Sequence, residues 1–144
     1  MPAQRRIDLV LESVKRLQRI GANANLLNLL QKQHPADLAQ VFGELTERDR
    51  RDSFALLVER YSRLAMEAIS ELGPEDGAAM LADRSAEDLA ELLQELPSDD
   101  AAALIEHLPK TLSIAVLDLL ERREAGDVQN LLEYAEQTAG RIMN

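Results

Sequence analysis

The sequence has no cysteine and no tryptophan, and only two tyrosines and two phenylalanines among its 144 residues. Without cysteine the chain cannot form disulfides, zinc–thiolate sites or a thiolate nucleophile. So few aromatic side chains cannot build the stacking platforms that bind single-stranded nucleic acid, so we expect no nucleic-acid partner. The core must therefore consist of aliphatic side chains and methionine.

The short motifs of common enzymes are also missing. The six glycines are scattered and make no phosphate-binding loop, and there is no G-x-S-x-G nucleophile elbow. The two histidines lack metal-ligand spacing. His34 precedes Pro35 at an expected helix start and His107 falls in an expected last turn, so we predict local structural roles for both. We predict that the chain is not an enzyme.

Long apolar runs are absent as well. No stretch approaches the length of a membrane span, and the segment Met1–Arg6 is not followed by the apolar region of a signal peptide. We therefore expect a soluble domain.

The charge is divided unevenly along the chain, whose net charge is −10. Residues 1–33 carry six basic and two acidic side chains, whereas residues 65–108 carry twelve acidic ones and a single basic one, Arg84. The middle should repel nucleic acid and anionic lipid and attract cations or basic surfaces, although a solvated helix exterior is the ordinary explanation. The basic first helix is left with three possible contacts: a membrane surface, an acidic patch of this chain, or a neighbouring subunit.

A twelve-residue repeat runs through the chain. Leu89, Leu92, Leu93 and Leu96 have the i, i+3, i+4, i+7 spacing of one helix face, and this pattern recurs every twelve residues from Ser53 to Leu120. Arg60 and Arg84 interrupt it. Turn signals recur with the same period at Gly73-Pro74, Ser85-Ala86, Pro97-Ser98 and Pro109-Lys110. Helices of about ten residues are too short to be stable alone, so the units must stack on one another.

The predicted fold is all-α, a superhelical, α-solenoid-like stack of about nine or ten short helices. An amphipathic first helix with Ile7, Val14 and Ile20 on its apolar face should end at Gly21, and a last helix should begin near Val128. Ser85 and Asp88 resemble a capping box. The residues expected to be buried are Leu92, Leu93, Leu96, Leu104, Ile105, Leu108, Val116 and Leu117.

Three segments together resemble one known family. They are Gln33–Ala39 (QHPADLA), Leu96–Ala102 (LPSDDAA) and Tyr134–Met143 (YAEQTAGRIM). Each is similar to a motif of the cytoplasmic N domain of MgtE-type magnesium transporters. The resemblance implies a regulatory domain on the cytoplasmic side that senses intracellular Mg²⁺ and contacts CBS domains, favouring a closed pore. It divides the chain into a helical N domain, residues 1–137, and the start of a linker, residues 138–144. The CBS and transmembrane domains that this family implies do not follow in the sequence, so we expect either an excised domain, which the end at Asn144 favours, or a whole protein that kept only this module.

The same resemblance implies the residues that contact the ion. Glu67 and Asp99 match interface ligands of the family, Asp100 stands beside Asp99, and Ala103 replaces a further acid of some members. Mg²⁺ is therefore expected to bind weakly, at an interface with CBS domains of the same polypeptide or of a dimer mate. The membrane is expected to be reached only through the missing transmembrane domain. Acids in a first helical turn are also favoured by the helix dipole, and this is the alternative explanation for Asp99 and Asp100, without any metal.

A second family remains open as an alternative. The middle domain of flagellar motor-switch proteins also stacks short helices and has a helix start similar to Gln33-His34-Pro35. In that case the chain would be a protein-interaction or assembly module without metal sensing. The Asp99-Asp100 helix start and the Thr138–Met143 segment argue against this alternative.

Overall fold

The computed structural model describes residues 2–123. Within this range the chain consists only of helices and the short connections between them. None of these residues lies in a strand, which confirms the all-α prediction. The predicted last helix from Val128 and the linker at residues 138–144 lie outside the described residues. A further helical segment covers residues 110–123. The complete helices are α1 (Pro2–Ile20), α2 (Asn23–Gln31), α3 (Pro35–Glu44), α4 (Glu47–Arg60), α5 (Ser62–Leu72), α6 (Pro74–Leu81), α7 (Ala86–Leu93) and α8 (Ser98–Glu106).

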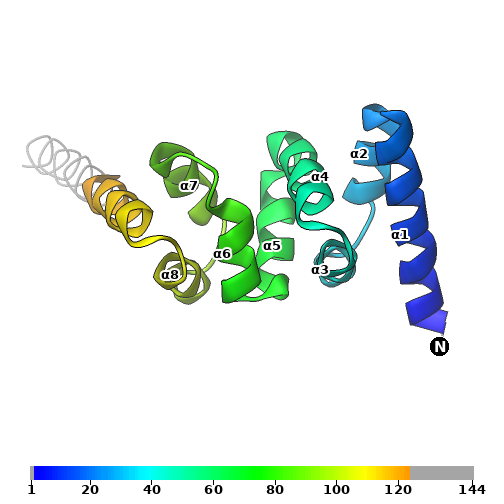
Figure 1. The fold of residues 1–144 in the computed structure, drawn as a ribbon. Helices are drawn as coiled ribbons and strands as arrows, with labels where there is room; N and C mark the ends of the chain where they lie inside the picture. The colour runs from blue at the N-terminus through cyan, green and yellow to red at the C-terminus, as the bar shows by residue number, and fades with distance from the viewer. Residues whose placement is uncertain (1, 124–144) are drawn as a thin grey trace, which may run out of the picture.

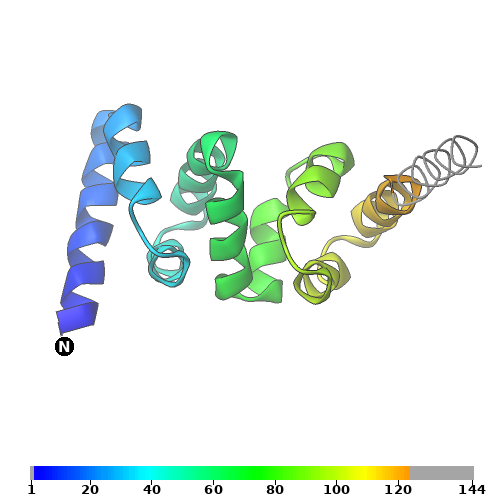
Figure 2. The same cartoon turned by 180° about the vertical axis from the view of Figure 1, so that it is seen from behind.

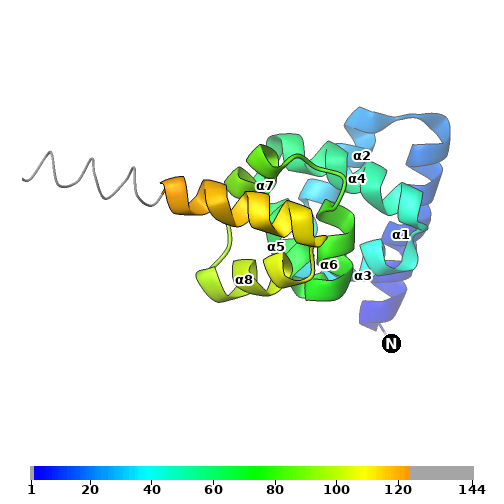
Figure 3. The ribbon, with the colours of Figure 1, turned by 60° about the vertical axis from the view of Figure 1, so that its left-hand side comes forward.

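The helices form an elongated stack with α1 at one end and α7 and α8 towards the other (Figure 1). The main packing contacts join each helix to the next along the chain or to the next but one, as in the pairs α1–α3, α3–α5 and α6–α8. The same order is seen from behind in Figure 2. Seen from the side in Figure 3, the helices run in several directions and are not all parallel to one another. The predicted solenoid-like architecture is therefore confirmed.

Local capping explains where several helices begin. The side chains of His34, Thr46 and Ser85 each accept a hydrogen bond from a backbone N–H in the first turn of α3, α4 and α7. The predicted capping box at Ser85 is only half formed. The carboxylate of Asp88 accepts a hydrogen bond from Arg84 at 2.8 Å instead of reaching back to the start of the helix.

The two histidines have local structural positions, as predicted. Nδ1 of His34 accepts the backbone N–H of Ala36 at 3.1 Å and so caps α3. Nδ1 of His107 lies 2.9 Å from the carbonyl oxygen of Ala103, where α8 ends. Both imidazoles therefore satisfy backbone groups at helix termini.

The repeated apolar face forms the core. Seven of the eight residues expected to be buried are buried, from Leu92 to Val116. The prediction for Leu117 is wrong, because 44% of this residue is exposed on a side of segment 110–123 that faces an open apolar hollow. The prediction for Ile20 is also wrong: it is 67% exposed at the last position of α1, where the chain turns away at Gly21.

Arg84 and Phe54 show how the stack accommodates an interruption of the repeat. The guanidinium of Arg84 lies 5.2 Å from the centroid of the Phe54 ring and also forms an ion pair with Asp88. A charged side chain thus covers an aromatic ring in a cation–π arrangement while its charge stays compensated. The repeat position keeps its packing function although it is not aliphatic.

Gly77 marks a close approach of α6 to two other helices in the middle of the stack. A Cβ atom at this position would lie 2.8 Å from Cδ2 of Leu104 on α8 and 2.9 Å from Cγ2 of Ile69 on α5. It would also lie 3.0 Å from the backbone oxygen of Ile69, which cannot move like a flexible side-chain end. The absence of a side chain at Gly77 therefore sets how closely α6 packs between α5 and α8.

Gly77→Ala should destabilise the protein although alanine is the better helix former. We expect a loss of about 1–3 kcal/mol from overpacking. Gly43→Ala is the matched control, because its Cβ would meet only Leu72 at 3.9 Å. That change should stabilise by about 0.4–1 kcal/mol. Urea denaturation of both variants measures the two effects, and a stabilising Gly77→Ala would refute the close approach.

Leu93 and Glu91 provide a second test, since they lie on opposite faces of α7. Leu93 is 2% exposed, whereas the Glu91 side chain is 72% exposed. The ion pair of Glu91 is long, with 4.0 Å between its Oε1 and Nη2 of Arg123. Leu93→Ala should cost about 2–5 kcal/mol. Glu91→Ala should change stability by less than about 0.5 kcal/mol. Equal melting temperatures of the two variants would mean that the core face of α7 has been assigned wrongly.

Candidate functional site

The twelve carboxylates of residues 65–108 are the most concentrated chemical feature of the described structure, and we refer to them as the acidic surface. All of them are exposed or partly exposed, and none is buried. They lie on four consecutive helices and the turns between them. The acidic surface consists of Glu67, Glu71, Glu75, Asp76, Asp83, Glu87, Asp88, Glu91, Glu95, Asp99, Asp100 and Glu106.

Only a minority of these charges are compensated within the chain. Four carboxylates form ion pairs within residues 4–123: Glu67 with Arg63, Asp83 with Arg51, Asp88 with Arg84, and Glu91 with Arg123. The remaining eight form no ion pair with any residue in that range. A surface of this kind repels another acidic surface and attracts cations.

Asp99 and Asp100 occupy the first turn of α8, where the helix has no side-chain cap. The residue before the helix is Pro97, and no side chain accepts a hydrogen bond from the first-turn N–H groups. The negative charges of the two aspartates therefore complement the helix dipole without capping it by a hydrogen bond. Helix α6 repeats this arrangement, with Glu75 and Asp76 after an N-cap that offers no side-chain acceptor.

Glu67 has a different environment. It lies in the middle of α5, its side chain is 43% exposed, and its Oε1 accepts a hydrogen bond from Nε of Arg63 at 3.2 Å. No helix dipole explains a carboxylate at this position. An exposed ion pair one helical turn apart contributes little to stability, so Glu67 is free to exchange this partner for another cation.

The structure does not gather the three expected residues into one preformed cluster. Within the described part of the chain, no group of three or more histidine or acidic side chains is placed to hold a metal ion. Carboxylate oxygens are the ligands that Mg²⁺ prefers, so the chemistry of Glu67, Asp99 and Asp100 fits this ion. Their arrangement in this chain supplies separate ligands on an open surface.

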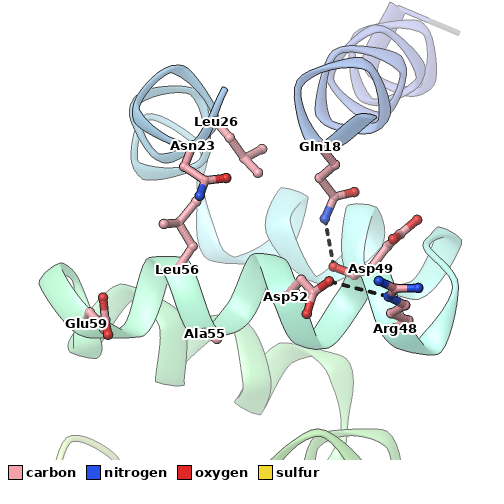
Figure 4. A pocket seen from close by; sticks show the side chains of 9 residues that line it. All are labelled: Gln18, Asn23, Leu26, Arg48, Asp49, Asp52, Ala55, Leu56 and Glu59. Carbon is pink, nitrogen blue, oxygen red and sulfur yellow. Dashed lines mark hydrogen bonds and ion pairs between the residues drawn. The ribbon is translucent and has the colours of Figure 1, made fainter. Parts of the chain in front are cut away.

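A second feature, which sequence reasoning missed, is a polar hollow of about 520 Å³ between the α1–α2 pair and α4 (Figure 4). Gln18 of α1 points towards α4, where its Nε2 donates to the backbone oxygen of Asp49 at 3.0 Å and to Oγ of Ser53 at 2.7 Å. Ser53 is fully buried. These hydrogen bonds join residues more than thirty positions apart in the sequence. No local sequence motif predicts a contact over that separation. The hydrogen bonds of Gln18 beside this hollow thus attach α1 to α4.

No helix within the described range is both long and apolar enough to cross a bilayer. The stack of short helices with its repeated packing defines a helical-repeat domain, and the uncompensated acidic surface is its chief chemical feature. The sequence profile of the family described as "MgtE intracellular N domain" matches residues 33–137. The chain belongs to this family. Neither the curated proteins nor the solved structures contain a match to this chain.

Family membership confirms the resemblance that the sequence motifs indicated. The match begins at Gln33, in the turn before α3, and so leaves α1 and α2 outside it. It associates the domain with magnesium transport and favours that interpretation over a flagellar motor-switch module. The roles expected for Glu67, Asp99 and Asp100 remain predictions.

The dipole explanation for Asp99 and Asp100 can be tested without any metal. Replacing both by asparagine should lower stability by about 0.6–2 kcal/mol at low ionic strength, because two charges favoured by the dipole are lost. Glu106→Gln is the control at the opposite end of the same helix, where removing a negative charge should stabilise. Urea midpoints in EDTA measure both changes. If both variants are stabilised, mutual repulsion of the acids outweighs the dipole and the explanation fails.

Proposed function

We propose that this chain is the regulatory domain of a magnesium transporter and that its acidic surface contacts CBS domains in a manner controlled by intracellular Mg²⁺. The observation that supports this most directly is the set of eight carboxylates without ion pairs in residues 4–123, on a domain of the MgtE intracellular N family. Leaving so many like charges uncompensated weakens a folded domain. If these carboxylates bind a cation and face a second protein surface, that function accounts for the loss of stability.

The physical basis is the repulsion between facing carboxylate surfaces. Two such surfaces at close range raise the free energy of any compact arrangement of the domains, and salt screens the repulsion only in part. Mg²⁺ bound between them supplies the positive charge that offsets the repulsion. The acidic surface thereby makes the compact arrangement, with a closed pore, depend on the ion, and regulation is a shift between two populations.

Glu67 and Asp99 are the residues that we assign to this contact, with Asp100 beside them. Both side chains are accessible, and Asp99 forms no ion pair within the described residues. Because Mg²⁺ keeps several waters and takes one or two protein carboxylates, separate acids on one surface are sufficient when a partner supplies the others. Arg63 holds Glu67 while that partner is away and would compete with the ion for it.

The regulatory role requires no catalytic group in this domain. The CBS domains would belong to the same polypeptide or to a dimer mate, on the inner side of the membrane, in accordance with the family's description as an intracellular domain. The domain would act only by favouring one arrangement of its partners over another.

This proposal predicts that Mg²⁺ alone affects the isolated chain weakly. With millimolar Mg²⁺ and a millimolar dissociation constant, binding to the folded state stabilises by about 0.4 kcal/mol. The melting temperature should rise by about 1–3 °C relative to NaCl at matched ionic strength. The matched salt is essential because screening alone relieves repulsion within the acidic surface.

Linking the chain to the paired CBS domains of an MgtE-type transporter should make the Mg²⁺ response clearly larger. Glu67→Gln combined with Asp99→Asn should reduce this larger response. Glu75→Gln combined with Glu106→Gln is the matched control, because it removes the same charge from the same surface. An equal loss in both double variants would mean that only total charge matters. A stronger response in the isolated chain than in the linked protein would contradict the interface.

A further inference from the structure

Helix α1 carries a basic surface that neither the family match nor the acidic surface explains. Four of its side chains, Arg5, Lys15, Arg16 and Arg19, are exposed and form no ion pair with residues 4–123. Arg6 differs from them, because it turns towards α3 and pairs with Asp37 at 2.9 Å. The same helix also exposes two acids, Asp8 and Glu12, so the exposed side chains of α1 keep a net positive charge.

Helix α1 also exposes large aliphatic side chains. Leu9 is 58% exposed and Ile20 is 67% exposed, so one helix holds two of the few large apolar residues that lie open in the described structure. Arg5, Leu9, Arg16 and Ile20 are separated by four, seven and four residues, which places them along one side of the helix. We refer to these four residues as the outer stripe.

The opposite side of α1 is fixed to the stack. Ile7 and Val14 are buried, and α1 packs against both α2 and α3. Figures 1 and 2 show α1 at the end of the stack, with no other described helix beyond it. The outer stripe is thus held in place by a packed helix and faces outward.

We propose that the outer stripe of α1 binds an anionic lipid surface, with arginine side chains on the headgroups and Leu9 and Ile20 at the acyl boundary. Basic side chains beside exposed aliphatic ones are the combination that attaches a helix to the interface of an anionic bilayer. Arginine suits this position because its long apolar stem can lie along the hydrocarbon while its charge stays at the headgroups.

The negative charge of the rest of the chain does not prevent this contact. The acidic surface lies on α5–α8 and the turns between them, and α2, α3 and α4 lie between these helices and α1 (Figure 1). Each helix is about 10 Å across, so most of the acids lie farther from the stripe than the screening length of about 8 Å at physiological salt. An anionic surface therefore meets the basic end of the molecule first.

The size of the stripe favours a bilayer over an acidic protein. A helix of 19 residues is about 28 Å long and about 10 Å wide, so its outer side offers about 300 Å². A stable protein interface needs about 800 Å² from each partner. A bilayer needs no shape complementarity, and many charged headgroups can act together on one straight helix.

The inference rests on the proposed function in one respect: association with a membrane transporter keeps a bilayer within reach of α1. It also revises the expectation that the membrane is reached only through a transmembrane domain. In the proposed arrangement, α1 faces the bilayer while the acidic surface faces the CBS domains.

Sedimentation of the full chain with vesicles in EDTA tests the lipid contact. We expect binding to vesicles of phosphatidylcholine mixed with phosphatidylglycerol, no binding to pure phosphatidylcholine, and loss of most binding in high salt. Arg5→Glu combined with Arg16→Glu should weaken binding about tenfold or more, since each basic residue near the surface contributes about fivefold. Leu9→Gln should weaken it without changing charge.

Arg60→Glu combined with Lys110→Glu is the matched control, because both side chains are exposed elsewhere and the charge change is identical. Circular dichroism melting checks that every variant is folded, and Leu9→Gln still tests the stripe if a charge variant is not. Binding that the control weakens equally, or no binding to anionic vesicles, overturns the proposal. Self-association that the stripe variants abolish, without lipid binding, would assign the stripe to a second copy. Neither CBS domains nor Mg²⁺ are present, so the outcome is independent of the regulatory role.

Discussion

The packing of each short helix against its neighbours is the interaction on which the rest of the structure depends. Helices α6 and α7 have eight residues and α8 has nine, lengths at which an isolated helix is unstable in water. Their stability comes from burying one apolar face against helices that are next or next but one along the chain. Two local features serve this burial: the missing side chain of Gly77 lets helices approach closely, and the side chain of Arg84 covers the ring of Phe54.

Because the stack uses one face of each helix for packing, the other faces are free to carry charge. The acids of α5–α8 and the bases of α1 occupy such free faces, so the charge pattern can be changed without disturbing the core. Negative charge near the start of a helix is also favoured locally by the helix dipole, as at Asp99 and Asp100. The acidic surface therefore combines a local contribution to helix stability with negative charge that is left available to a partner.

The sequence was sufficient to predict the architecture because a period of twelve residues determines both the apolar face and the turns. It was insufficient for Leu117 and Ile20, because periodicity identifies a face but not whether another element covers it. The hydrogen bonds of Gln18 to α4 and the tight space at Gly77 depend on tertiary distances that no local pattern contains. For the candidate site, residue type and exposure were predictable for Glu67, Asp99 and Asp100, whereas their spatial relation was not.

The contacts between near neighbours also determine how such a chain can change in length. When a helix contacts mainly its nearest two neighbours on each side, a helical pair can be gained or lost at one end while the interior joints keep their packing. The α1–α2 pair, which precedes the family match, stands at such an end and is joined to the stack by α1–α3 and α2–α4 contacts. A terminal helical pair can therefore acquire new charged or apolar surface side chains without any change in the packing of the core.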